Sequence, residues 1–240
     1  MEMAVEEHLE ELRRRLFIFI LALFLALLVL FPLSGEVFKR MQADLILTGD
    51  GTAVQVIATS LTESIVARVK IATYSALLFI LPTVGFYEAF SFVNPGLRAK
   101  ERRVVFATVI PVFFMFVVGA IFAYKVLLPV MISFLVGFTL DMGVQPYLAV
   151  DMMVTFIFAT MLLMGLMFEL PVICALLSWL GVLPPSLLSY YRRHIYLIIF
   201  IVAGVVTPDP TFVSQFVLAI PMVILFELGV VFARIMWRGE

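Results

Sequence analysis

The amino-acid sequence predicts an all-α membrane protein, a concave bundle of six transmembrane helices with both termini in the cytoplasm. Hydrophobic residues make up 64% of its 240 residues and charged residues only 14%, which is too little polar surface to cover a soluble domain of this size. The apolar residues also fall in blocks of about 20, the length that a helix needs to cross a bilayer core. We therefore treat residues 1–240 as a single membrane-embedded domain.

The elements follow in chain order. Residues 2–15 alternate Glu and Arg around leucines, which predicts a short amphipathic helix on the membrane surface. The next block lacks a small-residue cleavage site, so we expect it to be retained as the first span. Residues 34–66 form the longest polar stretch, with a turn signal at Thr48-Gly49-Asp50-Gly51, and a loop through Asp141 follows the third span. The predicted spans cover about residues 16–33, 69–90, 104–127, 150–177, 194–206 and 212–233.

Two features of the spans constrain their packing. Four spans contain a proline, which frees a backbone carbonyl that a neighbouring helix must satisfy, so a packed bundle is implied. The fifth span, His194–Val206, has only 13 residues and would cover roughly 20 Å. It therefore predicts a shortened hairpin with the sixth span that thins the bilayer. Alternatively, Tyr190 and Tyr191 extend the fifth span. The four prolines are Pro82, Pro111, Pro171 and Pro221.

Basic residues near the span ends predict the orientation. Eleven of the 16 lysines and arginines fall on one side of the predicted membrane and five on the other, so the first side is assigned to the cytoplasm. Six spans with both ends inside agree with this division. The larger group is Arg13, Arg14, Arg15, Arg98, Lys100, Arg102, Arg103, Arg192, Arg193, Arg234 and Arg238; the smaller is Lys39, Arg40, Arg68, Lys70 and Lys125.

Three carboxylates lie in or near the apolar spans. A charged group at bilayer depth costs at least ~2.5–3.5 kcal/mol, so each needs a partner or water. Glu169 is the deepest, and we expect it to face a water-accessible groove lined by other spans; a structural residue bonded to a neighbouring helix is the alternative. Both readings stay open for Glu227, and Glu88 is assigned a structural role. Gln215, near the outer end of the sixth span, is a further polar group.

Several function classes are disfavoured. A net charge of −1 argues against nucleic acid as a partner. The sequence has no H-E-x-x-H, G-x-S-x-G or P-loop motif, so we expect no enzyme activity, metal or cofactor. The remaining alternative is a proton-coupled small-molecule transporter that uses Glu169 and Glu227 as proton carriers. The absence of visible internal repeats counts against it.

Five segments in register with the six spans together resemble the TatC family, the multi-spanning receptor subunit of the twin-arginine protein translocase. On spacing alone, Glu11 and Glu101 would be ordinary surface ion pairs. The resemblance instead implies that they bind signal peptides. The segments are His8-Leu9-Glu10-Glu11-Leu12-Arg13-Arg14-Arg15; Phe92-Val93-Asn94-Pro95-Gly96-Leu97 followed by Glu101-Arg102-Arg103; Phe168-Glu169-Leu170-Pro171; Thr207-Pro208-Asp209-Pro210 with Ser214-Gln215; and Ala219-Ile220-Pro221 with Phe226-Glu227.

The resemblance implies a receptor that binds twin-arginine signal peptides and helps export folded proteins, driven by the proton-motive force. It implies a multi-pass protein of the cytoplasmic (inner) membrane of a prokaryote, working in a multi-copy complex with single-span subunits of the TatA and TatB type. A carboxylate accepts the rigid fork of a guanidinium bidentately, whereas a lysine offers a point charge. The expected signal-peptide site is Glu11, Glu101, Phe92, Arg102 and Arg103; the expected intramembrane partner site is Glu169, Gln215 and Glu227.

Overall fold

The structure, a computed structural model, describes residues 2–46, 55–93, 99–207 and 212–237. Most of them are helical. The first half contains α1 (Glu2–Leu30), α2 (Ser34–Ile46), strand β1 (Gln55–Ile57), α3 (Glu63–Ile80), the π-helical segment η1 (Leu81–Gly85) and α4 (Phe86–Val93). The second half contains α5 (Ala99–Phe122), the π-helical segment η3 (Ala123–Leu127), α6 (Leu128–Asp141), strand β2 (Tyr147–Ala149), α7 (Val150–Trp179), α8 (Pro185–Tyr190), α9 (Arg192–Val206) and α10 (Phe212–Met236).

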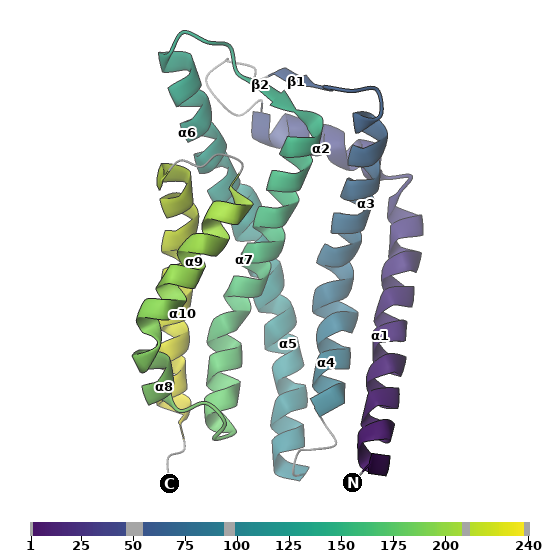
Figure 1. Ribbon diagram of the computed structural model, residues 1–240, viewed down its shortest axis with the longest axis vertical. Coiled ribbons are helices and arrows are strands. Elements are labelled where there is room, and N and C mark those ends of the chain that lie inside the picture. Colours follow the sequence, from purple (N-terminus) through teal and green to yellow (C-terminus); the bar gives the residue numbers. More distant parts are fainter. Residues whose placement is uncertain (1, 47–54, 94–98, 208–211, 238–240) are drawn as a thin grey trace.

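The long helices run along one axis and form a bundle (Figure 1). The first turns of α1 and the last turns of α10 lie at the same end. We call this the terminal end, and the opposite end, which carries α2 and the two strands, the cap end (Figure 1). Helix α7 is central, because α5, α10 and α3 all pack against it.

Four helical segments within the described residues are long and apolar enough to cross a membrane, and a fifth is added if α1 and α2, bent by 75°, count as one span. Helix α9 has 15 residues and falls below that length. The chain is therefore an all-helical protein with four to five apolar membrane-span candidates. The four are Glu63–Phe92, Glu101–Asp141, Val150–Trp179 and Phe212–Met236.

Three expectations about helix boundaries are wrong. Residues 2–15 do not form a separate surface helix but are the first half of α1, since Arg and Leu favour helix and no Gly or Pro interrupts them. The third predicted span does not end at 127: η3 and α6 extend it to Asp141 because residues 128–140 are also apolar. Tyr190 and Tyr191 do not extend the fifth span, because Tyr191 leaves helical geometry between α8 and α9.

The described residues of the predicted polar stretch 34–66 include α2 and β1, and β1 pairs in parallel with β2 at the cap end. The buried carboxylate of Glu63, at the start of α3, links the segment after β1 to the start of α7 by accepting hydrogen bonds from the backbone N–H groups of Asp151 (2.8 Å), Ser60 (3.3 Å) and Thr59. The predicted turn at Thr48–Gly51 lies outside the described residues.

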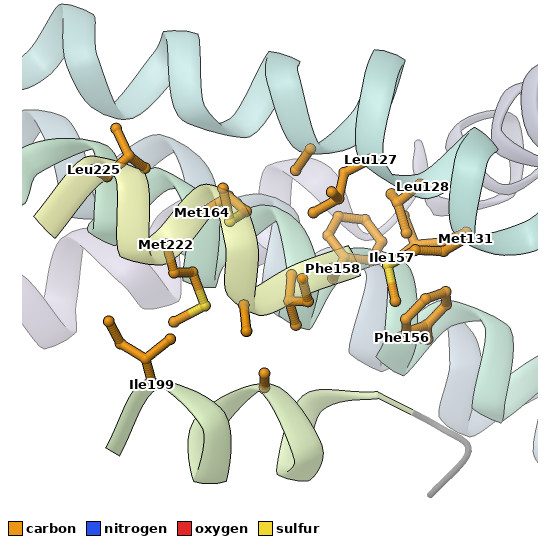
Figure 2. Close-up of a cluster of buried hydrophobic side chains, with 14 of the residues drawn as sticks. Leu127, Leu128, Met131, Phe156, Ile157, Phe158, Met164, Ile199, Met222 and Leu225 are labelled. Atoms are coloured by element: carbon orange, nitrogen blue, oxygen red, sulfur yellow. The ribbon is translucent and has the colours of Figure 1, made fainter. Parts of the chain in front are cut away.

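A continuous apolar core joins α7 to its neighbours. The side chains of Met222 from α10 and Ile199 from α9, both buried, point toward one another (Figure 2). Between α5 and α7 the contact is closer still. A Cβ at Gly119 would lie 2.6 Å from the carbonyl oxygen of Met164, and a Cβ at Gly165 would lie 2.8 Å from the ring of Phe116. Glycines thus allow these two helices to approach more closely than larger residues would.

Candidate functional site

Helix α1 presents Glu11 and Arg15 one turn apart near the terminal end of the bundle. The Nη2 of Arg15 donates to Oε1 of Glu11 at 2.6 Å, and its Nε donates to the same oxygen at 3.1 Å. Its Nη1 donates to Oε2 of Glu88 on α4 at 2.8 Å. One guanidinium is therefore held between two carboxylates from two different helices. Sequence spacing gave no signal for the second contact, since Arg15 and Glu88 are 73 residues apart.

A cavity of about 600 Å³ surrounds this cluster. Glu11, one of the predicted signal-peptide residues, forms part of its wall, and so does Glu88, to which the sequence assigned only a structural role. Charged and polar side chains dominate the wall, which suits a charged ligand. The lining residues are Glu10, Glu11, Arg14, Arg15, Ile18, Tyr87 and Glu88.

An apolar groove of about 510 Å³ adjoins the cavity. Arg15 and Glu88 belong to the walls of both, so the two spaces meet at this ion pair. Phe92, predicted as a binding residue, lines the groove beside α1. The other lining residues are Leu12, Leu16, Phe19, Leu81, Gly85, Phe86 and Ala89.

The remaining predicted binding residues begin α5. Glu101 is half-buried in its first turn, and Arg102 and Arg103 are exposed. The guanidinium of Arg102 lies 6.0 Å from the ring centre of Phe106. None of the three is among the described residues that line the cavity or the groove. The structure thus brings Glu11 and Phe92 to adjoining spaces and leaves Glu101 at the start of a separate helix.

The expectation that Glu169 faces a water-accessible groove is wrong. Its side chain is 1% exposed, and its Oε1 has no hydrogen-bond partner among the described residues. The reason is the central place of α7, which is covered by α5 on one flank and α10 on another. No face of this helix is polar enough to mark in advance which side the neighbours cover.

Glu227 and Gln215 are both engaged with α9. Glu227 accepts hydrogen bonds from Nη2 of Arg192 (2.8 Å) and from the hydroxyl of Tyr196. Gln215 donates from Nε2 to the carbonyl of Phe200 at 2.5 Å. The two lie 12 positions apart on α10, roughly 18 Å along its axis. Within the described part of the chain, no hydrogen bond or ion pair joins either of them to Glu169.

Metal-ligating side chains do not cluster in the described residues: no group of three or more His, Cys, Asp or Glu could hold a metal ion there. The described residues at the terminal end instead form a cavity with both carboxylates and guanidinium groups in its wall. Several long apolar helices with a charged cavity at one end define a polytopic helical membrane protein.

Comparison with known proteins identifies the family. Residues 7–221 match the family described as Sec-independent protein translocase protein (TatC), and the chain belongs to this family. It is 29% identical to TatC of Aquifex aeolicus over 99% of this chain and 98% of that protein, and 33% identical to TatC of Escherichia coli over 95% of this chain and 86% of that protein. A crystal structure of the twin-arginine translocase receptor TatC superposes with a TM-score of 0.86 at 30% identity, covering 95% of this chain and 99% of that one.

Proposed function

We propose that this protein is the receptor subunit of a twin-arginine translocase, which binds twin-arginine signal peptides at the terminal end and helps export folded proteins. The observation that carries the proposal is the guanidinium already held there. Glu11 accepts hydrogen bonds from two nitrogens of Arg15 at 2.6 and 3.1 Å, which supports the binding of a guanidinium at this carboxylate. Membership of the TatC family supports the same function.

In this proposal Glu11 binds one arginine of the signal peptide and Glu101 binds the other. Phe92, Arg102 and Arg103 help to shape the surface between them. The apolar groove gives the hydrophobic part of a signal peptide a place next to the carboxylates, since cavity and groove share Arg15 and Glu88. A lysine ligand would lack the planar fork that a carboxylate accepts bidentately, so arginine is preferred.

The proposed location is the cytoplasmic membrane of a prokaryote, with six spans and both termini in the cytoplasm. Two observations support this orientation. The first turns of α1 and the last turns of α10 lie at the same end of the bundle (Figure 1), and 11 of the 16 basic residues are assigned to that side. The fifth of the six spans would be α9, which at 15 residues is roughly 22 Å long and requires a thinned bilayer.

The proposed partners are single-span subunits of the TatA and TatB type in a multi-copy complex. We place their contact on the hairpin of α9 and α10, near the partly exposed Gln215 and Glu227. Because Glu169 is enclosed, we assign it a structural role and not a direct partner contact. The same enclosure, and the pairing of Glu227 with Arg192, give no support to a proton-coupled transporter. The family is named for translocation, so we also propose no enzyme activity.

The test is equilibrium binding of a labelled signal peptide to the purified protein in nanodiscs, comparing a twin-arginine with a twin-lysine sequence. E11Q and E101Q should each weaken twin-arginine binding by about tenfold or more, since each removes a charge-assisted hydrogen bond of ~1.5–3 kcal/mol. E36Q is the matched control, because Glu36 forms an exposed ion pair with Lys39 on α2 at the cap end. Unchanged twin-arginine preference in the E11Q/E101Q double variant would overturn the proposal.

A further inference from the structure

The carboxylate proposed to receive a signal-peptide arginine is already occupied by a guanidinium of the same chain. Arg15 donates Nε and Nη2 to Glu11, whereas it donates Nη1 to Glu88. The two carboxylates thus use different nitrogens. The bonds to Glu11 and the bond to Glu88 therefore do not compete for the same N–H group.

Exposure distinguishes the two carboxylates. The side chain of Glu11 is 30% exposed, that of Arg15 is 23% exposed and that of Glu88 is 15% exposed. A ligand that enters the cavity therefore reaches Glu11 more easily than Glu88. Glu88 is the deeper of the two and is better placed to retain Arg15.

The charge of the described lining residues, which we call the wall, fits one additional cation. Among them Glu10, Glu11 and Glu88 contribute −3, and Arg14 and Arg15 contribute +2, so this wall carries −1. Two carboxylates share the single guanidinium of Arg15. One incoming arginine would give each carboxylate its own guanidinium and bring the wall to zero net charge.

We infer that Arg15 is a resident guanidinium that occupies Glu11 in the peptide-free protein, and that it moves wholly onto Glu88 when a peptide arginine binds Glu11. The inference rests on the proposed function and adds to it a regulatory step and a residue, Glu88. Glu88 is a positioning residue here: it makes no contact with the peptide and acts by accepting the displaced Arg15.

The exchange sets affinity and does not set selectivity. Every cation that binds Glu11 must displace the same guanidinium, which makes two hydrogen bonds to this carboxylate, so the cost is equal for arginine and for lysine. The preference for arginine comes from its planar fork, which a lysine ammonium lacks. Removal of Arg15 should therefore tighten twin-arginine and twin-lysine binding by similar factors.

The test measures the dissociation constants of labelled twin-arginine and twin-lysine peptides for five proteins in nanodiscs: the wild type, R15Q, R14Q, E88Q and R15Q/E88Q. R14Q is the matched control, because Arg14 lines the same cavity but forms none of the ion pairs described for it. R14Q and R15Q change the wall charge equally, from −1 to −2. Any gain in peptide affinity of R15Q beyond that of R14Q is therefore due to the removal of Arg15 from Glu11.

We expect R15Q to bind the twin-arginine peptide about fivefold more tightly than R14Q does, and E88Q to bind it about fivefold more weakly than the wild type. The double variant is decisive. Glu10 and Glu11 contribute −2 and Arg14 contributes +1, so its wall carries −1, as in the wild type. Long-range electrostatics then predicts wild-type affinity, whereas the exchange predicts affinity about fivefold above the wild type.

Three results would overturn the inference. R15Q binding no more tightly than R14Q would make Arg15 a structural tie between α1 and α4. A double variant as weak as E88Q would mean that Glu88 contacts the peptide directly. If R15Q lowers the melting temperature, R15K takes its place in the comparison. R15K keeps the charge but lacks the guanidinium fork, so it should bind the twin-arginine peptide more tightly than the wild type. Equal affinity of R15K and the wild type would refute the exchange. If the wild type does not prefer the twin-arginine peptide to the twin-lysine peptide, the proposed function itself is wrong, and this outcome is distinct from failure of the exchange.

Discussion

The close approach of α5 and α7 predicts a large cost for one added methyl group. In G119A the new Cβ would lie 2.6 Å from the carbonyl oxygen of Met164 and 2.9 Å from Cβ and Cγ of Phe168. Ordinary van der Waals contact begins near 3.4 Å, so the first distance is 0.8 Å too short. The obstacle is backbone, which cannot rotate away, and the two helices must separate. We expect destabilisation of about 1–3 kcal/mol, the usual cost of overpacking a well-packed core.

The assay is the thermal stability of the purified protein in detergent, followed by size-exclusion chromatography of heated samples. G137A is the matched control: Gly137 lies on α6, and a Cβ there would meet nothing within 4 Å. The control should be neutral or slightly stabilising, because alanine favours helix more than glycine by about 1 kcal/mol. Equal stability of G119A and G137A would refute the packing argument. G165A should cost less than G119A, since the ring of Phe116 can move where a carbonyl cannot.

Three other predictions concern the cap end, the hairpin and α7. Glu63→Ala should expose the segment around Thr59 to hydrogen exchange and lower the melting temperature, because three backbone N–H groups lose a charged acceptor. Glu63→Gln should be milder, and equal protection in both variants would contradict this. Single cysteines along 207–211 should react with an impermeant thiol reagent added to the outer aqueous phase, although their positions lie at a shallower depth from the cytoplasmic side than cysteines at the end of α6. A depth of ~30 Å for α9, the full bilayer core, would rule out thinning. Glu169→Gln should leave the stability of the protein unchanged or higher than that of the wild type. Glu169→Leu should fold and should impair assembly with single-span subunits less than substitution of Gln215 does. A severe and specific assembly defect in Glu169→Leu would instead support a direct contact between Glu169 and those subunits.

Hydropathy predicted the long helices well because a block of about 20 apolar residues has few other stable structures in a bilayer. The predicted spans 69–90, 150–177 and 212–233 all fall within helical segments. Helix ends were harder to predict. They depend on breaking and capping residues, and neither Arg15–Leu16 nor Leu127–Leu128 contains one.

The candidate site was predictable only in part. Family resemblance selected Glu11 and Phe92, and the structure places both in adjoining spaces of one region. The pairing of Glu88 with Arg15 was not predicted, because the two residues are 73 positions apart and no spacing rule links residues on different helices. The enclosure of Glu169 was missed for a related reason: α7 is apolar on all sides, so its sequence does not show which side other helices cover.

Glu88 and Glu169 show that position along a span does not determine the surroundings of a carboxylate in the protein. Glu88 lies near the end of its apolar segment, beside a cavity lined by α1 and α4, and its carboxylate pairs with Arg15 there. Glu169 lies within a helix packed by α5 and α10, where its side chain is enclosed. A carboxylate in a membrane protein is therefore a candidate for a part in ligand binding where it borders a cavity, and a candidate for a structural role where neighbouring helices enclose it.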